Sequence, residues 1–401
     1  MPTVDVWPEE PAEQDGAVTV AAVLERESGA RARLWYRLPA SHRSALTASC
    51  DPFVLGAVFS AMRAGARLAV HGAVSPSLID NLSDFQDAWA AWRRALYRKV
   101  DISADTEREA APPPGGECVQ AFSGGMDSSF TAWRHRAGAA NRRRHNLRAG
   151  VMIHGFDIPL AQEEVFGRAA AKSSAILASV GMELIPVATN FRELRDPWLD
   201  AHGAGLASCL ALLGGRFGAG LIASSFPYGA LSLPYGSNPL TDPMMSSRAF
   251  RIAHDGAAFS TLQKTRALAD WPELLQNLRV CWQGPEKDRN CCRCQKCVTY
   301  MLYFRIMGRP VPPCFERELT DRDIRRLRYA DRDMIHSTDR LVFVARKEGV
   351  RASWVRALAL SVWLNRGRLA WSRTGGRAAA VLWRGLVAAA SALKRASRLK
   401  R

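Results

Sequence analysis

The chain has 401 residues, 48% of them hydrophobic and 23% charged, so it can form two or three cores and is neither a disordered nor a fibrous protein. Its formal net charge is +17, but residues 351–401 hold twelve Lys or Arg and no Asp or Glu, which leaves 43 basic and 38 acidic side chains in the first 350 residues. Nucleic-acid binding through overall charge therefore loses its main support, because the excess lies in a tail that suits anionic lipid equally well.

The N-terminal part of the chain is expected to hold a segment of residues 1–16 and a small α+β domain of residues 17–109. The first ten residues lack the basic start and apolar run of a signal peptide. Alternating or apolar runs predict strands over 18–24, 33–38, 67–74 and 97–103.

Two helices interrupt these predicted strands. The first is expected over 51–64, and the second begins with Ser75 as N-cap and Pro76 at its first position. Apolar residues at spacings of three and four give the second helix one stripe that faces a core: Leu78, Leu82, Phe85, Trp89, Trp92 and Leu96. The sequence Ala-Ala-Pro-Pro-Pro-Gly-Gly at 110–116 then breaks regular structure and predicts a linker.

Strands and helices alternate in the next part of the chain, residues 117–310. Strands are expected over 118–122, 147–154, 183–188 and 221–225, with helices from 127, over 161–180 and over 201–213. This rhythm is typical of βαβ units, so we expect an α/β fold with a doubly wound parallel sheet.

A glycine-containing loop follows the first of these strands. Residues 123–129 read Ser-Gly-Gly-Met-Asp-Ser-Ser, directly between a buried strand and a helix. Two glycines allow a ligand close to the backbone, the hydroxyls donate hydrogen bonds, and the helix N-terminus supplies N–H groups, so the loop suits an oxyanion. It is neither a Walker motif nor a dinucleotide fingerprint. The alternative is an ordinary strand–turn–helix in which Asp127 and Ser128 serve as caps.

The same seven residues resemble the signature loop of the PP-loop ATP pyrophosphatases, over roughly residues 117–300. The resemblance implies a fold of the HUP type and an enzyme that splits ATP into AMP and pyrophosphate while it adenylates a substrate oxygen. It implies Asp127 and Ser128 as catalytic residues, with Asp127 positioning Mg²⁺. The implied ATP-binding residues are Ser123, Gly124, Gly125, Asp127, Ser128, Ser129 and His154.

Further polar residues are expected at the carboxyl edge of the sheet. His154 ends the second strand, where it either contacts ligand or serves as a satisfied structural histidine. Thr189–Asn190 and Ser224–Ser225 end the next two strands, and the loop 235–243 either covers the crevice or is a plain surface loop. Asp242, His254 and Asp255 are weaker candidates for substrate contact.

Cysteines crowd into residues 281–297, as in a metal site of a protein from a reducing compartment. Cys281, Cys291, Cys294 and Cys297 have the spacing C-x9-C-x2-C-x2-C, which predicts a closed, structural tetrahedral zinc site. An iron–sulfur cluster or a reactive thiol patch are the alternatives. Cys292 is a fifth thiol next to a predicted ligand. A cysteine cluster of this kind, downstream of the loop 123–129, resembles the arrangement in the 7-cyano-7-deazaguanine synthases. The match is partial, because Cys292 and Arg293 stand where that family has a Gly-containing step.

The C-terminal part is expected to hold a helical extension, residues 311–350 with a helix over 321–336, and a basic amphipathic tail, residues 351–401. The longest apolar stretch, 378–393, is shorter than the roughly 20 residues of a membrane-spanning helix. The tail either binds the inner membrane surface peripherally or packs on the body of an otherwise cytoplasmic protein. On a helical projection one face holds four arginines and a serine, namely Arg377, Arg384, Ser391, Arg395 and Arg398. The opposite face holds Leu382, Leu386 and Leu393, and tryptophans lie at intervals: Trp354, Trp363, Trp371 and Trp383.

The leading hypothesis is an ATP-dependent ligase that activates a carboxylate or carbonyl oxygen of a small-molecule acceptor for attack by a nitrogen donor. The alternatives are a tRNA-thiolating enzyme and a non-catalytic nucleotide-binding zinc scaffold. Sulfur transfer needs an exposed thiol of low pKa, but Cys118 falls in a predicted buried strand and Cys209 in a predicted helix. Cys50 and Cys314 lack an obvious paired cysteine, so the sequence supplies no clear sulfur carrier. Nucleic-acid binding is not favoured, and homodimerisation stays open. One basic stretch reads as a solvated surface, with RNA or an acidic substrate as alternatives: Arg134, Arg136, Arg142, Arg143, Arg144 and Arg148.

Overall fold

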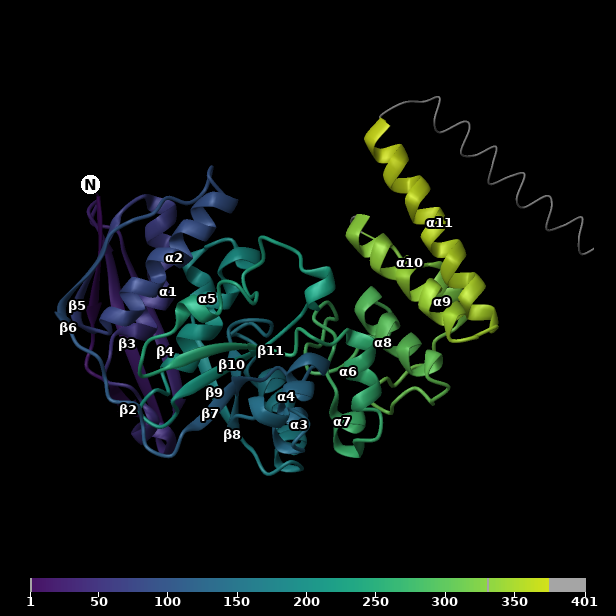
Figure 1. Ribbon diagram of the computed structural model, residues 1–401, viewed down its shortest axis with the longest axis horizontal. Helices are drawn as coiled ribbons and strands as arrows, with labels where there is room; N and C mark the ends of the chain where they lie inside the picture. Colours follow the sequence, from purple (N-terminus) through teal and green to yellow (C-terminus); the bar gives the residue numbers. More distant parts are fainter. Residues whose placement is uncertain (1, 330–331, 375–401) are drawn as a thin grey trace, which may run out of the picture. The chain divides into compact units, whose positions relative to one another are not determined.

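The computed structural model describes residues 2–329 and 332–374 and divides the chain into two compact units (Figure 1), Met1–Arg289 and Asn290–Arg401. The first unit is α/β and contains an eleven-stranded mixed sheet. The second unit, as far as it is described, is helical. The predicted α/β class is confirmed.

The sheet has the order β11-β10-β7-β8-β9-β4-β3-β1-β5-β6, with β2 paired to β3. Its strands are β1 (Thr3–Pro8), β2 (Ala12–Gln14), β3 (Ala17–Arg26), β4 (Arg31–Pro39), β5 (Arg67–Val74), β6 (Ile102–Glu107), β7 (Glu117–Ala121), β8 (Asn146–His154), β9 (Glu183–Thr189), β10 (Ala219–Ala223) and β11 (Arg251–Asp255).

The five strands from β7 to β11 form a parallel, doubly wound half of the sheet. Helices α3 (Met126–Arg136), α4 (Glu163–Ala178) and α5 (Trp198–Ala211) connect them. The crossover through α5 reverses direction from β9 to β10, and since such crossovers are right-handed, α5 covers the face opposite α3 and α4. Figure 1 shows α5 on the other side of the strands from α3 and α4.

The N-terminal strands continue the same sheet. β4 pairs antiparallel with β9, where Tyr36 lies opposite Thr189. Asn190 strengthens this junction, because its side chain accepts from the Trp35 N–H at 3.0 Å and donates to the Arg33 carbonyl at 2.7 Å. One hydrophobic core extends from Val4 to Ile252. Residues 17–109 and 117–310 were predicted as separate domains; the structure instead joins 1–289 in one unit and places the division at Arg289, after the linker candidate 110–116.

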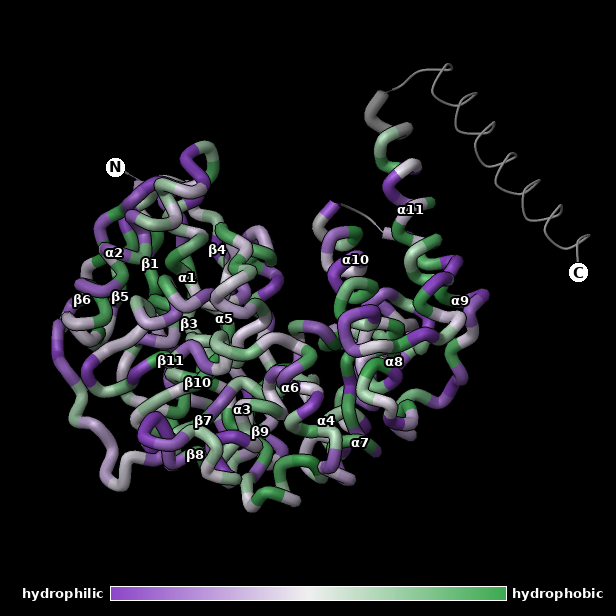
Figure 2. Tube along the Cα trace, turned by 45° about the vertical axis from the view of Figure 1, so that its right-hand side comes forward, coloured by the Kyte–Doolittle hydropathy of each residue, from purple (hydrophilic) through white to green (hydrophobic). Residues whose placement is uncertain are grey.

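Helix α1 (Asp51–Ala64) is buried along almost its whole length, as its apolar sequence requires. Figure 2 colours it largely in the green of hydrophobic residues. The predicted stripe on α2 (Pro76–Trp92) is buried at Leu78, Leu82, Phe85 and Trp89, but the helix ends at Trp92 and leaves Leu96 exposed.

Ser75 is the N-cap residue of α2 and Pro76 follows it, as predicted, although the Ser75 hydroxyl donates to Asp51 at 2.7 Å and not into the helix. Two other expectations for this region need correction. The last strand of the N-terminal part begins at Ile102 rather than at residue 97. Residues 1–16 hold β1, which lies between β3 and β5 and was missed because its alternation is short. The unit is completed by α6 (Thr261–Ala267) and α7 (Pro272–Asn277).

The second unit contains α8 (Gln295–Ile306), α9 (Asp321–Arg325), α10 (Arg332–Lys347) and α11 (Ser353–Thr374). The single helix predicted over 321–336 is wrong, because α9 already ends at Arg325. The start of the tail belongs to α11, which packs against α9 and α10 and buries Trp354 and Leu358. The basic and apolar faces predicted from Arg377 to Arg398 lie outside the described residues. No helix in the described ranges is both long and apolar enough to cross a membrane.

Candidate functional site

The carboxyl ends of β7 to β11 meet at one edge of the sheet, since these strands are parallel. The chain passes from β7 to β8 on one side of β7 and returns to β10 on the other side. The crevice at such a switch point is where open α/β sheets bind ligands. The loop 123–129 follows β7, and Ser224 and Ser225 follow β10, so both border this switch point.

The backbone of the loop depends on Gly124. Its φ is +71°, in the left-handed region, and an added Cβ would meet the Ser173 hydroxyl at 2.9 Å. The loop is closed by its own side chains: the Gly125 N–H donates to the Ser123 hydroxyl at 3.3 Å, and the Ser128 hydroxyl donates to the Gly125 carbonyl at 3.1 Å.

Helix α3 begins at Met126, directly after Gly125 and one residue before its predicted start at Asp127. The first N–H groups of a helix have no acceptor within it and carry the positive end of the helix dipole. The loop therefore presents amide donors and the hydroxyls of Ser123 and Ser128 at one place. Ser129 is buried, and its hydroxyl has no hydrogen-bond partner among the described residues.

Lys264 brings a cation to this loop. Its side chain is only 2% exposed, and its ammonium lies 2.7 Å from Asp127 Oδ1 and 2.6 Å from the Ser224 carbonyl. The lysine is held by α6, whose N-terminus carries a capping box between Ser260 and Gln263. Lys264 thus ties the end of β10 to the start of α3 across the switch point.

Arg279 brings a second cation. Its guanidinium donates twice to the Ser123 carbonyl, at 3.2 and 3.0 Å, and once to Lys287 O at 3.1 Å. Its own N–H donates to the Gly124 carbonyl at 2.9 Å. The side chain is 6% exposed, and its ion-pair contact with Asp157 is as long as 3.9 Å. Positive charge therefore accumulates beside the loop.

Neither Lys264 nor Arg279 was predicted as part of the site. Neither belongs to the loop motif, and more than 130 residues separate each from it. The one local sign was the motif Ser260-x-x-Gln263, which marks the start of the helix that carries Lys264. The loop 235–243 does reach this region: burial together with the charges of Asp157 and Asp127 raises the pKa of Tyr235.

His154 has a structural environment. Its Nε2 lies 2.9 Å from the Pro159 carbonyl and its ring stacks on Phe166 at 4.4 Å. Burial lowers the pKa of His154 and so favours the neutral ring. These contacts agree with the alternative of a satisfied structural histidine.

Asp242 and Asp255 are also engaged within the fold. Asp242 accepts from Ser237, from the Asn238 N–H and from His254 Nδ1, and so organises the loop 235–243. Burial opposes ionisation of Asp255, but hydrogen bonds and charge from His135, Arg134 and Thr131 outweigh it and lower its pKa. Asp255 thereby ties the end of β11 to α3.

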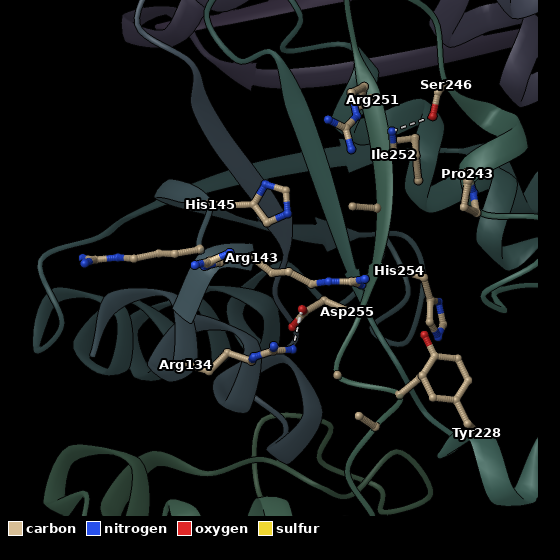
Figure 3. A pocket seen from close by; sticks show the side chains of 16 residues that line it. Arg134, Arg143, His145, Tyr228, Pro243, Ser246, Arg251, Ile252, His254 and Asp255 are labelled. Atoms are coloured by element: carbon tan, nitrogen blue, oxygen red, sulfur yellow. Dashed lines mark hydrogen bonds and ion pairs between the residues drawn. The ribbon is translucent and has the colours of Figure 1, made fainter. Parts of the chain in front are cut away.

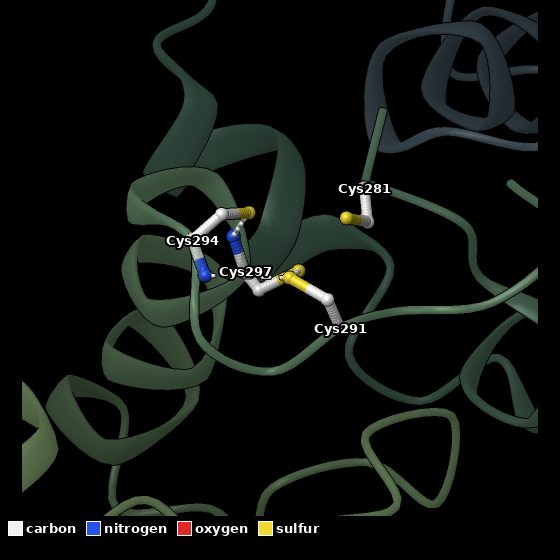
Figure 4. A group of neighbouring side chains, drawn as sticks. All are labelled: Cys281, Cys291, Cys294 and Cys297. Atoms are coloured by element: carbon white, nitrogen blue, oxygen red, sulfur yellow. Dashed lines mark hydrogen bonds between the residues drawn. The ribbon is translucent and has the colours of Figure 1, made fainter. Parts of the chain in front are cut away.

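The four predicted zinc ligands come together, as Figure 4 shows. The sulfur atoms of Cys281, Cys291, Cys294 and Cys297 lie within 4.8 Å of one another, and Cys291 and Cys297 are 3.9 Å apart. Four thiolates at about 2.3 Å from a zinc ion stand about 3.8 Å apart in a tetrahedron. Backbone N–H groups of Gly284, Cys294 and Cys297 donate to three of the sulfurs, so the set is compatible with zinc.

Cys292 is outside this set. Its φ is +57°, and its thiol points to the Asn290 carbonyl at 3.4 Å. Burial raises the pKa of Cys292, of Cys118 and of Cys50, the last to about 11. Burial likewise raises the pKa of Cys209. None of these four thiols has the low pKa that a sulfur carrier needs.

Comparison of the chain with protein-family models, with curated proteins and with solved structures finds no match.

Proposed function

We propose that the protein is an ATP-dependent adenylating enzyme that splits ATP into AMP and pyrophosphate at the loop 123–129. The observation that carries this proposal is the convergence of Lys264 and Arg279 on a Gly-Gly loop at the switch point of a parallel sheet. Amide donors, hydroxyls and two buried cations match the charge of a β,γ-pyrophosphate.

In this mechanism an acceptor oxygen attacks the α-phosphorus of ATP, and the bond from that phosphorus to the bridging oxygen breaks. Loop amides and the hydroxyls of Ser123 and Ser128 hold the departing pyrophosphate, and Lys264 and Arg279 neutralise the charge that develops on it. Lys264 holds Asp127 Oδ1, and the Asp127 carboxylate is the group that would hold Mg²⁺. Mg²⁺, when bound there, would neutralise further phosphate charge. A nitrogen donor then attacks the adenylated carbon and releases AMP.

Within this proposal the four clustered cysteines hold a structural zinc ion. Four protein ligands complete a tetrahedron and leave no coordination position for substrate. The thiolation alternative lacks support, because burial raises the pKa of three thiols outside the cluster, those of Cys50, Cys118 and Cys209.

The test is Mg²⁺-dependent formation of AMP and pyrophosphate with candidate acceptors, in the wild-type protein and in Asp127→Ala. Asp127 is 27% exposed, so the variant is expected to fold. We expect the variant to lose at least about 100-fold in rate. A folded Asp127→Ala protein with wild-type turnover would refute the assignment.

A further inference from the structure

A pocket lies along the outer side of β11, the last strand of the sheet (Figure 3). Its volume is about 830 Å³, which is within the range of about 300–1,000 Å³ usual for small-ligand sites. The wall comes from β11, from the segment between α3 and β8, and from the residues around Tyr228 and Ser246. The Ser246 hydroxyl accepts from the Ile252 N–H at 2.9 Å. This backbone donor at the edge of β11 therefore already has a partner and does not pair with a further strand.

Arginines dominate this lining. Arg142, Arg143 and Arg144 enter from the segment before β8, and Arg251 enters from the start of β11. The basic stretch that the sequence suggested as a solvated surface thus forms one wall of a cavity together with a residue more than 100 positions away. We name the group Arg142, Arg143, Arg144 and Arg251 the arginine pocket.

The arginine pocket carries uncompensated charge. Among the described residues no carboxylate forms an ion pair with Arg142, Arg143 or Arg251, and the Arg144 guanidinium donates only to backbone carbonyls of His135 and Arg136. Asp255, the acidic residue in the lining, already pairs with Arg134 at 2.8 Å. A multiply charged anion would balance this set.

His254 adds a polar group to the lining. Its side chain is 4% exposed, and Asp242 holds its Nδ1 at 2.7 Å. Its Nε2 is buried and has no hydrogen-bond partner within the described ranges. Buried polar atoms normally have a partner, so an unsatisfied nitrogen in the wall of a cavity is consistent with a missing ligand.

We propose that the arginine pocket binds a small ligand with two or more phosphate groups, at a site separate from the loop 123–129 and independent of the adenylation proposed there. Guanidinium groups suit phosphate because they donate paired hydrogen bonds and keep their charge. The limited volume favours a small ligand over a nucleic-acid strand. Tyr228, 58% exposed at this pocket, offers an aromatic ring to a ligand that also carries a base.

The test is calorimetric titration of the full chain with sodium tripolyphosphate in the presence of a chelator. The pocket variant is Arg143→Gln/Arg251→Gln. The matched control, Arg94→Gln/Arg108→Gln, removes the same charge from exposed arginines elsewhere in the first unit. We expect the pocket variant to bind tripolyphosphate at least about tenfold more weakly at this site, and we expect the control and Lys264→Met to retain it.

Hydrogen exchange supplies a second readout in the wild-type protein, where tripolyphosphate is expected to protect residues 141–145 and 251–256. Equal binding by the pocket variant and the control, or no binding by the wild-type protein, would overturn the proposal.

A single-stranded RNA 12-mer distinguishes the source of the phosphates. If it binds more tightly than tripolyphosphate and depends on the same two arginines, the ligand is a strand and not a small molecule.

Discussion

The loop 123–129 and the cysteine cluster are both short motifs, yet the structure surrounds them in different ways. The cysteine cluster contains its own ligands, and seventeen residues supply all four sulfurs. The loop 123–129 supplies donors and one carboxylate, but its cations come from Lys264 and Arg279, far along the chain. Spacing alone therefore predicts the four clustered cysteines, whereas the cations beside the loop are brought there by the fold of the chain.

The largest effect expected from this difference is on the cysteine cluster. Cys294→Ser removes one of four ligands, so we expect the metal content to fall from about one zinc ion per chain and the protein to lose stability broadly. Elemental analysis and thermal unfolding measure both. Cys292→Ser is the matched control, since its thiol lies outside the cluster, and it should retain zinc. Iron in place of zinc, or full metal content in Cys294→Ser, would contradict the assignment.

A smaller effect on stability is expected where Asp255 anchors α3, the helix that follows the loop 123–129, to β11. Asp255 holds α3 to β11, and its pKa in the folded protein is below the ordinary value of 3.8. The ionised carboxylate therefore contributes stability that is fully present above that value and is lost as the pH falls through the folded pKa. Asp255→Asn should lower the free energy of unfolding by about 2 kcal/mol at pH 7.

Denaturant unfolding from pH 7 to pH 3 measures this dependence. The difference between wild type and Asp255→Asn should shrink below about pH 4. Asp87→Asn, which alters an exposed pair with Lys99, should change stability by no more than about 0.5 kcal/mol. A difference that is constant over the whole pH range would show that the Asp255 charge is not responsible.

The smallest effect concerns the glycine that shapes the loop. Gly124→Ala places a Cβ at positive φ and close to Ser173, so it should lower the free energy of unfolding by about 1 kcal/mol. Gly167 lies within α4 with open space around it, and Gly167→Ala should instead stabilise by about 0.5–1 kcal/mol. If both substitutions change the free energy of unfolding in the same direction, the backbone conformation at Gly124 is not the reason for a glycine there.

Much of the parallel half of the sheet could be predicted because apolar runs and helical periodicity are local signals. The strand before the loop, the start of α3 and the ends of β8 and β9 all lie within a few residues of their expected positions. The four clustered cysteines were also predicted, because ligand spacing is local.

The junction between β4 and β9 could not be predicted, because strand pairing over about 150 residues leaves no periodic trace. Tyr36 and Asn190 look like ordinary core and strand-end residues until they meet. Lys264 and Arg279 were missed for the same reason. Their roles depend on where α6 and the segment after α7 lie against the loop, and not on any spacing within the sequence.

The most direct test of the central claim is the affinity of the full chain for ATP with Mg²⁺, measured by calorimetry in the wild type, Lys264→Met and Arg279→Gln. We predict that the wild type binds ATP and that each substitution weakens binding by about 10-fold to 100-fold, because each removes a charge-assisted contact to phosphate. Lys99→Met, which removes a 44% exposed lysine, should bind ATP as the wild type does. Wild-type affinity in both Lys264→Met and Arg279→Gln, or no ATP binding by the wild type, would contradict the account.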